Sequence, residues 1–228
     1  MGLLRYLRER GFAGAPLPHG FDDEGREVLE FVEGEPGNYP LAPYMTSETV
    51  LVEAARLLRG FHDATLGYRA PRDAIWQFSY PDEREHEVIC HNDFAPYNMV
   101  FREQRPRAII DFDTAGPGPR IWDVAYAAYR FVPLSADPHS EALGWRLPYD
   151  RTGRLRAFCD SYGLERPETL LPTVERRLEA LLSLIAQGVA AGDPRFEQVM
   201  AEGHHENYQR DISFINQNRR LLAQALDD

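Results

Sequence analysis

The stretch HNDFAPYN, residues 91–98, places a histidine, an aspartate and an asparagine in the order H-x-D-x-x-x-x-N. The apolar run VIC precedes it at residues 88–90, and the apolar run MVF follows it at residues 99–101. Short apolar runs on both sides of a polar segment predict two strands joined by a loop. On such a tight loop, we expect the side chains of Asp93 and Asn98 to face the same cavity.

These residue types suit phosphoryl transfer from a nucleotide, which needs a carboxylate to orient the attacking hydroxyl and oxygen ligands for Mg²⁺. Asp93 supplies the carboxylate and Asn98 supplies one ligand. A second metal ligand, Asp111, follows the apolar end of the run IIDFD. We interpret His91 as an orienting group of the catalytic site, with a structural histidine as the alternative. Asp113 would reach a second metal or the substrate, or else cap a turn.

Taken together, HNDFAPYN and IIDFD resemble the catalytic and metal-binding loops of the aminoglycoside phosphotransferase and choline kinase family, which has the protein-kinase-like fold. Three further stretches agree with the family. REVLEFVEG, residues 26–34, is similar to the last strand of the small lobe and the hinge. LRGFHDAT, residues 58–65, and RIWDVAYAAYRF, residues 120–131, are similar to two helices of the large lobe. The resemblance covers residues 1–132 well.

The resemblance implies a role for each matching residue. Asp93 is the catalytic base, Asn98 and Asp111 bind Mg²⁺, and Asp123 braces the catalytic loop from behind. The base of the nucleotide, adenine in ATP or guanine in GTP, meets the hinge at Glu30, Phe31 and Val32.

The C-terminal segment AEGHHENYQRD is the expected acceptor site, because acidic side chains of the C-terminal helices bind the acceptor in the resembling family. The candidates are Glu202, Glu206 and Asp211. A metal site here is disfavoured, because the segment has no pair of histidines four residues apart. A polar helix face is the alternative. The aromatic residues Tyr126, Tyr129 and Phe131 are expected to pack in the core.

The fold class predicted is α+β: a protein-kinase-like two-lobed fold with a truncated small lobe and a mainly helical large lobe. Residues 1–34 read as a helix plus a hairpin, with DDEG as its turn and a hinge at about residues 30–35. Residues 35–228 form the helical lobe. It includes an amphipathic helix over residues 50–61, for which Thr46 or Ser47 is the expected cap.

One family feature is missing from the sequence. Kinases of this fold use a Gly-rich loop over the phosphates and a strand lysine. All 25 basic residues here are arginine, and no Gly-rich loop is visible. The small lobe therefore reads as lacking its first strands. The exposed strand edges of such a lobe would make an oligomer possible.

The composition limits the partners. A net charge of −11 argues against nucleic acid, which is bound through clustered basic residues, and favours a cationic small molecule as acceptor. No run reaches the roughly 20 apolar residues that span a membrane. We therefore expect a cytoplasmic enzyme without a membrane partner.

The function expected is an ATP- or GTP-dependent and Mg²⁺-dependent phosphotransferase. It moves the γ-phosphoryl group to a hydroxyl of a small molecule, such as an aminoglycoside or an amino alcohol. Two alternatives remain. The first is a catalytically degenerate kinase that binds a nucleotide or small molecule. The second, weaker one is a metal-dependent hydrolase that uses His91, Asp93 and Asp111.

Overall fold

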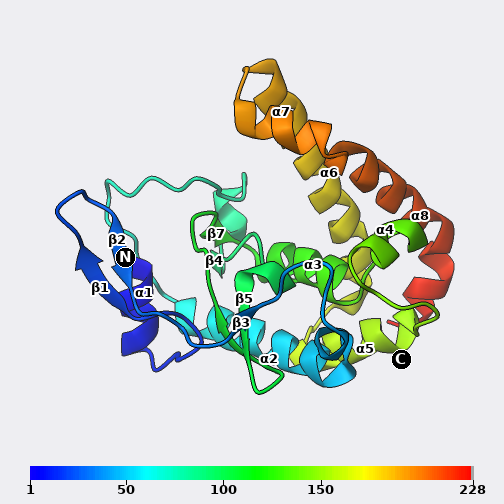
Figure 1. Ribbon diagram of the computed structural model, residues 1–228, viewed down its shortest axis with the longest axis horizontal. Coiled ribbons are helices and arrows are strands. Elements are labelled where there is room, and N and C mark those ends of the chain that lie inside the picture. The colour runs from blue at the N-terminus through cyan, green and yellow to red at the C-terminus, as the bar shows by residue number, and fades with distance from the viewer. Residues whose placement is uncertain (227–228) are drawn as a thin grey trace.

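The computed structural model describes residues 1–226 (Figure 1). Strands and helices alternate up to residue 118, and the chain from residue 120 onward is helical. The elements are α1 (Gly2–Glu9), β1 (Pro18–Phe21), β2 (Glu27–Leu29), β3 (Glu35–Pro36), α2 (Glu48–Thr65), β4 (Val88–Cys90), β5 (Met99–Arg102), β6 (Arg105–Ile109), β7 (Gly116–Gly118), α3 (Arg120–Phe131), α4 (Asp137–Ala142), α5 (Arg151–Tyr162), α6 (Leu170–Ala190), α7 (Pro194–Ala201) and α8 (His204–Gln224). The predicted α+β class is confirmed.

The N-terminal unit consists of α1 and the antiparallel hairpin β1–β2. The leucines of α1 recur at helical spacing and are all buried, and they join the same continuous core as the helices of the rest of the chain. The hairpin behaves differently, because every residue of β2 is exposed. The predicted helix and hairpin are therefore both confirmed, with α1 packed onto the helical part and the hairpin extending from it (Figure 1).

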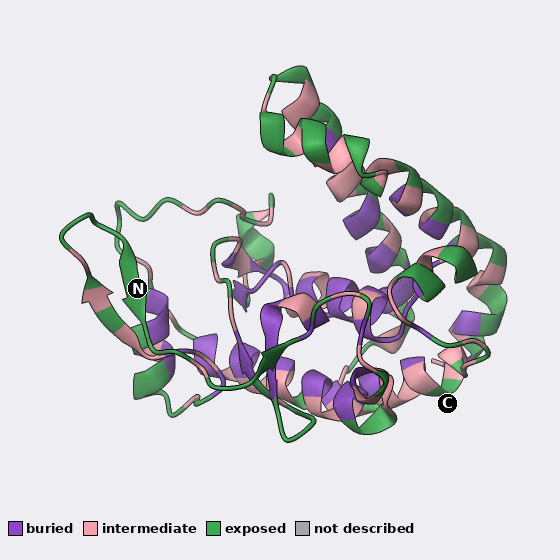
Figure 2. Cartoon of the chain, viewed as in Figure 1, coloured by how far each residue is buried: buried purple, intermediate pink, exposed green. Residues whose placement is uncertain are grey.

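The helix α2 is the central support of the fold. Its N-cap is Ser47, whose side chain accepts a hydrogen bond from the backbone N–H of Val50. Leu51, Leu58 and Phe61 are fully buried and form one apolar face. This face packs in the main core, and Figure 2 shows the buried residues gathered where α2 and α3 lie close together.

Two small sheets contain the strands that flank the loops 91–98 and 110–114. In the first, the strands are ordered β3-β5-β6, and in the second β4 pairs with β7. The pairing of β3 with β5 holds the segment that follows the hairpin β1–β2 against the strand that follows the loop 91–98. Gly37 extends this contact, because its N–H donates to the Met99 carbonyl oxygen at 3.2 Å. A Cβ atom at Gly37 would lie 2.2 Å from the Pro96 carbonyl oxygen, so only glycine permits this approach.

The C-terminal helices form a layer and an arm. Helix α6 packs against α3 and α8 through Val174 and Leu178, which are fully buried. The far end of α6 and the short helix α7 project away from the rest of the molecule (Figure 1), and no residue of α7 is buried. Within residues 1–226, no helix combines the length and the apolar character needed to cross a membrane.

Candidate active site

The loop 91–98 connects β4 to β5 and ends in a short 3-10 turn, Pro96–Asn98. Its backbone is anchored by Asp123, near the start of α3. One carboxylate oxygen of Asp123 accepts from the His91 N–H at 2.6 Å, and the other accepts from the Asn92 N–H at 2.9 Å. Asn92 has a positive φ of 64°, an uncommon conformation for a residue other than glycine, and these two bonds hold it there.

The anchor carboxylate belongs to a buried chain of hydrogen bonds. The Tyr162 hydroxyl donates to Nδ1 of His62 at 2.7 Å, and Nε2 of His62 donates to Asp123 at 3.0 Å. Burial lowers the pKa of His62, against the opposing influence of Asp123. Burial alone would raise the pKa of Asp123, but the hydrogen bonds from the His62 ring and from the His91 N–H bring it below its usual value. The chain is therefore a neutral histidine donating to an ionised aspartate, placed directly beneath the loop.

His91 is fully buried, and both of its ring nitrogens face the protein. Nε2 donates to the Ile110 carbonyl oxygen at 3.0 Å, and Nδ1 accepts from the Asp93 N–H at 3.3 Å. Both ring nitrogens are engaged within the protein and the side chain has no exposed surface. The structure places His91 as a positioning residue that ties the two loops together.

Asp93 lies on the loop with a partly exposed side chain. Its Oδ1 accepts from the Tyr97 hydroxyl at 2.5 Å, and its Oδ2 accepts from Nδ2 of Asn98 at 2.8 Å. Burial raises the pKa of Asp93, and the hydrogen bond from Tyr97 and the charge of Arg130 oppose this shift. The carboxylate is therefore fixed in orientation by two donors and is more basic than an ordinary aspartate.

The second loop, residues 110–114, lies against the first. The Ile110 N–H donates to the Asn98 carbonyl oxygen at 2.9 Å, and the Thr114 hydroxyl donates to the His91 carbonyl oxygen at 2.9 Å. Asp111 follows directly, with an exposed side chain and a positive φ of 62°. The structure thus brings Asp111 beside the end of the loop that carries Asn98. Asp113, two residues further on, is also exposed.

The donor set fits a magnesium ion held together with a nucleotide. Because Nδ2 of Asn98 donates to Asp93, the amide oxygen of Asn98 is not used by that bond, and Asp111 is exposed on the second loop, which adjoins Asn98 through the Ile110 N–H. Mg²⁺ is usually held by one or two protein oxygen ligands, with phosphates and waters completing the octahedron. In residues 1–226, no group of three or more His, Cys, Asp or Glu side chains converges on a metal position. A site that borrows its remaining ligands from phosphates is consistent with both observations.

The expected nucleotide segment lies at the end of β2, on the exposed side of the hairpin. The Glu30 N–H donates to the Leu17 carbonyl oxygen at 2.7 Å, and the Glu30 carboxylate accepts from the Leu17 N–H at 3.1 Å. Glu30 is thus used by the hairpin itself. Phe31 is 86% exposed, and Val32 is half-buried. Phe31 and Val32 therefore remain the part of the segment that is open to a ligand.

The expected acceptor residues are not brought together. Glu202 and Glu206 are exposed, and Glu202 pairs with His204 at 3.4 Å. Asp211 is fully buried. It accepts three hydrogen bonds, from Tyr129, the Ala136 N–H and His139. An acceptor-binding role for Asp211 is wrong, because its carboxylate is already saturated and has no open surface.

A different group of residues surrounds a cavity of about 590 Å³ beside Asp93. Sequence analysis missed this group. Its walls include four tyrosines, one arginine and a histidine: Tyr39, Tyr97, Tyr126, Tyr208, Arg130 and His139. Tyr129 and Phe131 pack in the core as predicted, but Tyr126 also faces this cavity. One sequence signal for this cavity was available: Tyr126 and Arg130 are four residues apart, which places them on the same face of the predicted helix.

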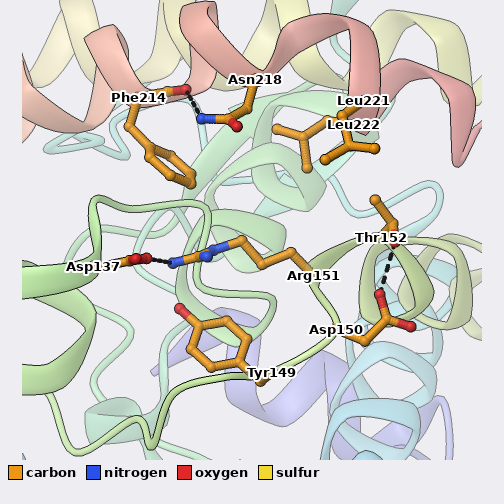
Figure 3. A pocket seen from close by; sticks show the side chains of 9 residues that line it. All are labelled: Asp137, Tyr149, Asp150, Arg151, Thr152, Phe214, Asn218, Leu221 and Leu222. Atoms are coloured by element: carbon orange, nitrogen blue, oxygen red, sulfur yellow. Dashed lines mark hydrogen bonds and ion pairs between the residues drawn. The ribbon is translucent and has the colours of Figure 1, made fainter.

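A second hollow, of about 350 Å³, lies between the start of α5 and α8 (Figure 3). Arg151 crosses it, with its guanidinium 4.5 Å from the Tyr149 ring centre and 4.7 Å from that of Phe214. The same guanidinium donates to Asp137 at 2.6 Å. None of the loop residues at positions 91–98 or 110–114 lines this hollow. Arg151 pairs with Asp137, and Asp150 accepts from the Thr152 hydroxyl and the Gly153 N–H at the start of α5. The hollow therefore reads as packing between helices.

Comparison with known proteins identifies the same part of the chain as this geometry does. Residues 69–158, which contain both loops, match the family described as the Phosphotransferase enzyme family. The trifolitoxin immunity protein of Rhizobium leguminosarum bv. trifolii is 35% identical over 176 residues, which cover 74% of this chain and 64% of that protein. The chain therefore spans somewhat less than two thirds of this relative's length.

Solved structures share the fold at low sequence identity. A candidate aminoglycoside phosphotransferase of Ralstonia eutropha JMP134 has a TM-score of 0.60 and 17% identity, covering 94% of this chain and 83% of that one. A choline/ethanolamine kinase family protein of Mesorhizobium loti has a TM-score of 0.56 and 14% identity, covering 94% and 82%. The streptomycin–ATP–APH(2'')-IIa ternary complex has a TM-score of 0.54 and 14% identity, covering 93% and 79%.

The fold is thus the kinase-like fold of small-molecule phosphotransferases, and the predicted architecture is confirmed. The resemblance to the aminoglycoside phosphotransferase and choline kinase family, first read from HNDFAPYN and IIDFD, is confirmed as well.

Proposed function

We propose that this protein is a nucleotide-dependent phosphotransferase that moves the γ-phosphoryl group of ATP or GTP to a hydroxyl of a small molecule. The observation that carries the proposal is the arrangement at Asp93: a carboxylate held by two donors, beside a metal-type ligand pair and beside a cavity large enough for an acceptor. The nucleotide in the APH(2'')-IIa complex supports the choice of co-substrate.

Asp93 is the proposed catalytic base. It would accept a hydrogen bond from the acceptor hydroxyl, align that oxygen with the γ-phosphorus, and take the proton as the new P–O bond forms. The bond from the γ-phosphorus to the bridging oxygen breaks in the same step, and ADP or GDP leaves with that oxygen. The acceptor would reach Asp93 from the cavity along Tyr97, because the Tyr97 hydroxyl donates to Asp93 and its ring lines the cavity. Burial raises the pKa of Asp93, which makes its carboxylate a better proton acceptor.

Asn98 and Asp111 are the proposed ligands of Mg²⁺, which when bound would neutralise charge on the phosphates. Phe31 and Val32 are the proposed contacts of the base, since Glu30 is engaged within the hairpin. Asp113 is retained as a ligand of a second metal or of the substrate. Glu202 and Glu206, which are exposed, stay proposed contacts of the acceptor.

The test is turnover of the Asp93→Asn variant. The full chain is incubated with Mg²⁺ and ATP or GTP over a panel of amino alcohols, aminoglycosides and hydroxy acids, and phosphorus NMR detects the new phosphate ester. We expect Asp93→Asn to lower turnover by about 10²- to 10⁴-fold, the usual contribution of a positioned base. Asp73→Asn, an exposed aspartate away from both loops, serves as the control. Equal turnover by Asp93→Asn and the unmodified chain would contradict the proposal.

A second candidate function is binding without turnover. The exposure of Phe31, 86%, favours it, because the described small lobe leaves the expected adenine contact uncovered. The immunity protein among the relatives makes capture of a toxic compound a natural form of this candidate. Ester formation by any acceptor in the same NMR assay excludes it.

A further inference from the structure

The cavity beside Asp93 has a charge opposite to that of the whole molecule. The chain carries a net charge of −11, yet no carboxylate lines this cavity. Its one permanently charged wall residue is Arg130, and its other polar atoms come from tyrosines, histidines and Asn38. A ligand bound there would therefore meet a local positive field, whatever the charge of the outer surface.

Arg130 is the source of that field. Its terminal nitrogen donates to the Tyr39 hydroxyl at 2.7 Å, but its buried Nε has no hydrogen-bond partner. Among residues 1–226, no carboxylate lies within ion-pair distance of it. An arginine in this position usually has an anion to pair with, because its planar guanidinium matches carboxylate and phosphate groups. The partner that the protein does not supply can come from a ligand.

Aromatic rings hold Arg130 in place. Its guanidinium carbon lies 5.1 Å from the ring centre of Tyr39, 5.4 Å from that of Tyr97 and 5.5 Å from that of Tyr129. The rings of Tyr39 and Tyr97 are steeply inclined to each other, at 70°. These three rings fix the guanidinium at low entropic cost, and two of them, Tyr39 and Tyr97, also give the cavity flat aromatic walls, which suit a planar ligand.

Two histidines also line the cavity, and each pairs with a carboxylate that lies outside the lining. His139 contacts the buried carboxylate of Asp211 at 2.6 Å, and His204 contacts that of Glu202 at 3.4 Å. Asp93 adjoins the cavity through Tyr97 and is the carboxylate reserved for the hydroxyl. An amine entering the cavity would be placed next to a guanidinium that no carboxylate of residues 1–226 pairs with directly, which is unfavourable in a site of reduced solvation.

We infer that the acceptor of this protein is a hydroxyl-bearing anion with a planar or aromatic body, whose carboxylate or similar group pairs with Arg130 while its hydroxyl reaches Asp93. This inference rests on the proposed function and names its substrate class. It replaces the cationic acceptor expected from the overall charge of the chain.

The test compares binding of three phenols that differ chiefly in charge: 3-(4-hydroxyphenyl)propionate, 4-ethylphenol and tyramine. Each is titrated into the full chain without nucleotide and followed by NMR. We expect the acid to bind at least about tenfold more tightly than the amine, with the neutral phenol between them. We also expect the advantage of the acid to shrink as salt is added.

Arg130→Met should abolish the preference, and Arg195→Met, an exposed arginine of α7, should leave it unchanged. The comparison within the unmodified chain decides the matter even where Arg130→Met does not fold. Equal or tighter binding of tyramine, or no binding of the acid, would overturn the inference.

This experiment separates the inference from the proposed function. Selective binding of the acid without any phosphate transfer would contradict the phosphotransferase assignment but leave the charge preference in place. Phosphorylation of amines in preference to acids would support the phosphotransferase assignment and overturn the preference for an anionic acceptor.

Discussion

The loop 91–98 and the hairpin β1–β2 are both short segments, but they are stabilised in different ways. The loop is held by side chains that lie far away in the sequence, above all Asp123 and, through it, His62. The hairpin is held by bonds within itself, such as those from Arg26 to Asp22, and its second strand is exposed throughout. The geometry proposed for phosphate transfer is thus built into the core, whereas the proposed adenine contact lies on a segment that contributes little to stability.

The largest effect on stability is expected from removal of the anchor of the loop. Asp123→Ala leaves the N–H groups of His91 and Asn92 without their acceptor in a buried site. We expect a loss of about 3–5 kcal/mol in the free energy of unfolding, measured with urea. The matched change in the hairpin is Asp22→Ala, where the carboxylate is at the surface. Its unfolding midpoint should stay within the error of the measurement. Similar losses for both variants would remove the contrast between the two segments.

A smaller effect is expected from pH, through His62. Burial lowers the pKa of His62 in the folded state below its ordinary value of 6.5. As the pH falls below 6.5, His62 becomes protonated in the unfolded chain but stays neutral in the folded chain. The folded state therefore loses stability on acidification, with His62 contributing at most about 1.4 kcal/mol per pH unit.

Urea unfolding between pH 8 and pH 5 measures this slope. His62→Gln should flatten the profile, whereas His19→Gln, an exposed histidine on β1, should not change it. A profile that keeps its full slope in His62→Gln would show that the histidine beneath the loop is not held in its neutral form.

The same contrast explains what could be predicted from the sequence. The hairpins, α2 and the loop 91–98 were predictable because local signals, such as apolar periodicity and the Ser47 cap, agree with the final fold. The strand β7 was missed. Its residues, Gly116–Gly118, carry no strand-like pattern, but they pair with β4. A Cβ atom at Gly116 would lie 1.7 Å from the Phe78 carbonyl oxygen, so only glycine fits there.

The site shows the same limit. Asp93, Asn98 and Asp111 stand out because they fall in short motifs, and the structure brings the two loops together. Asp211 resembles any exposed acid in the sequence, and only contacts from distant segments bury it. The cavity around Arg130 draws its walls from the linker, α3 and α8, and no local pattern reveals such an assembly.

The most direct test of the account is calorimetric titration of ATP and GTP into the full chain, with and without Mg²⁺. The account predicts binding that depends on Mg²⁺ and that weakens at least about tenfold in Asp111→Ala. Asp73→Ala should leave it unchanged. Binding that ignores Mg²⁺, or that survives intact in Asp111→Ala, would contradict the assignment of Asn98 and Asp111 as metal ligands. Absence of nucleotide binding by the unmodified chain would contradict the phosphotransferase itself.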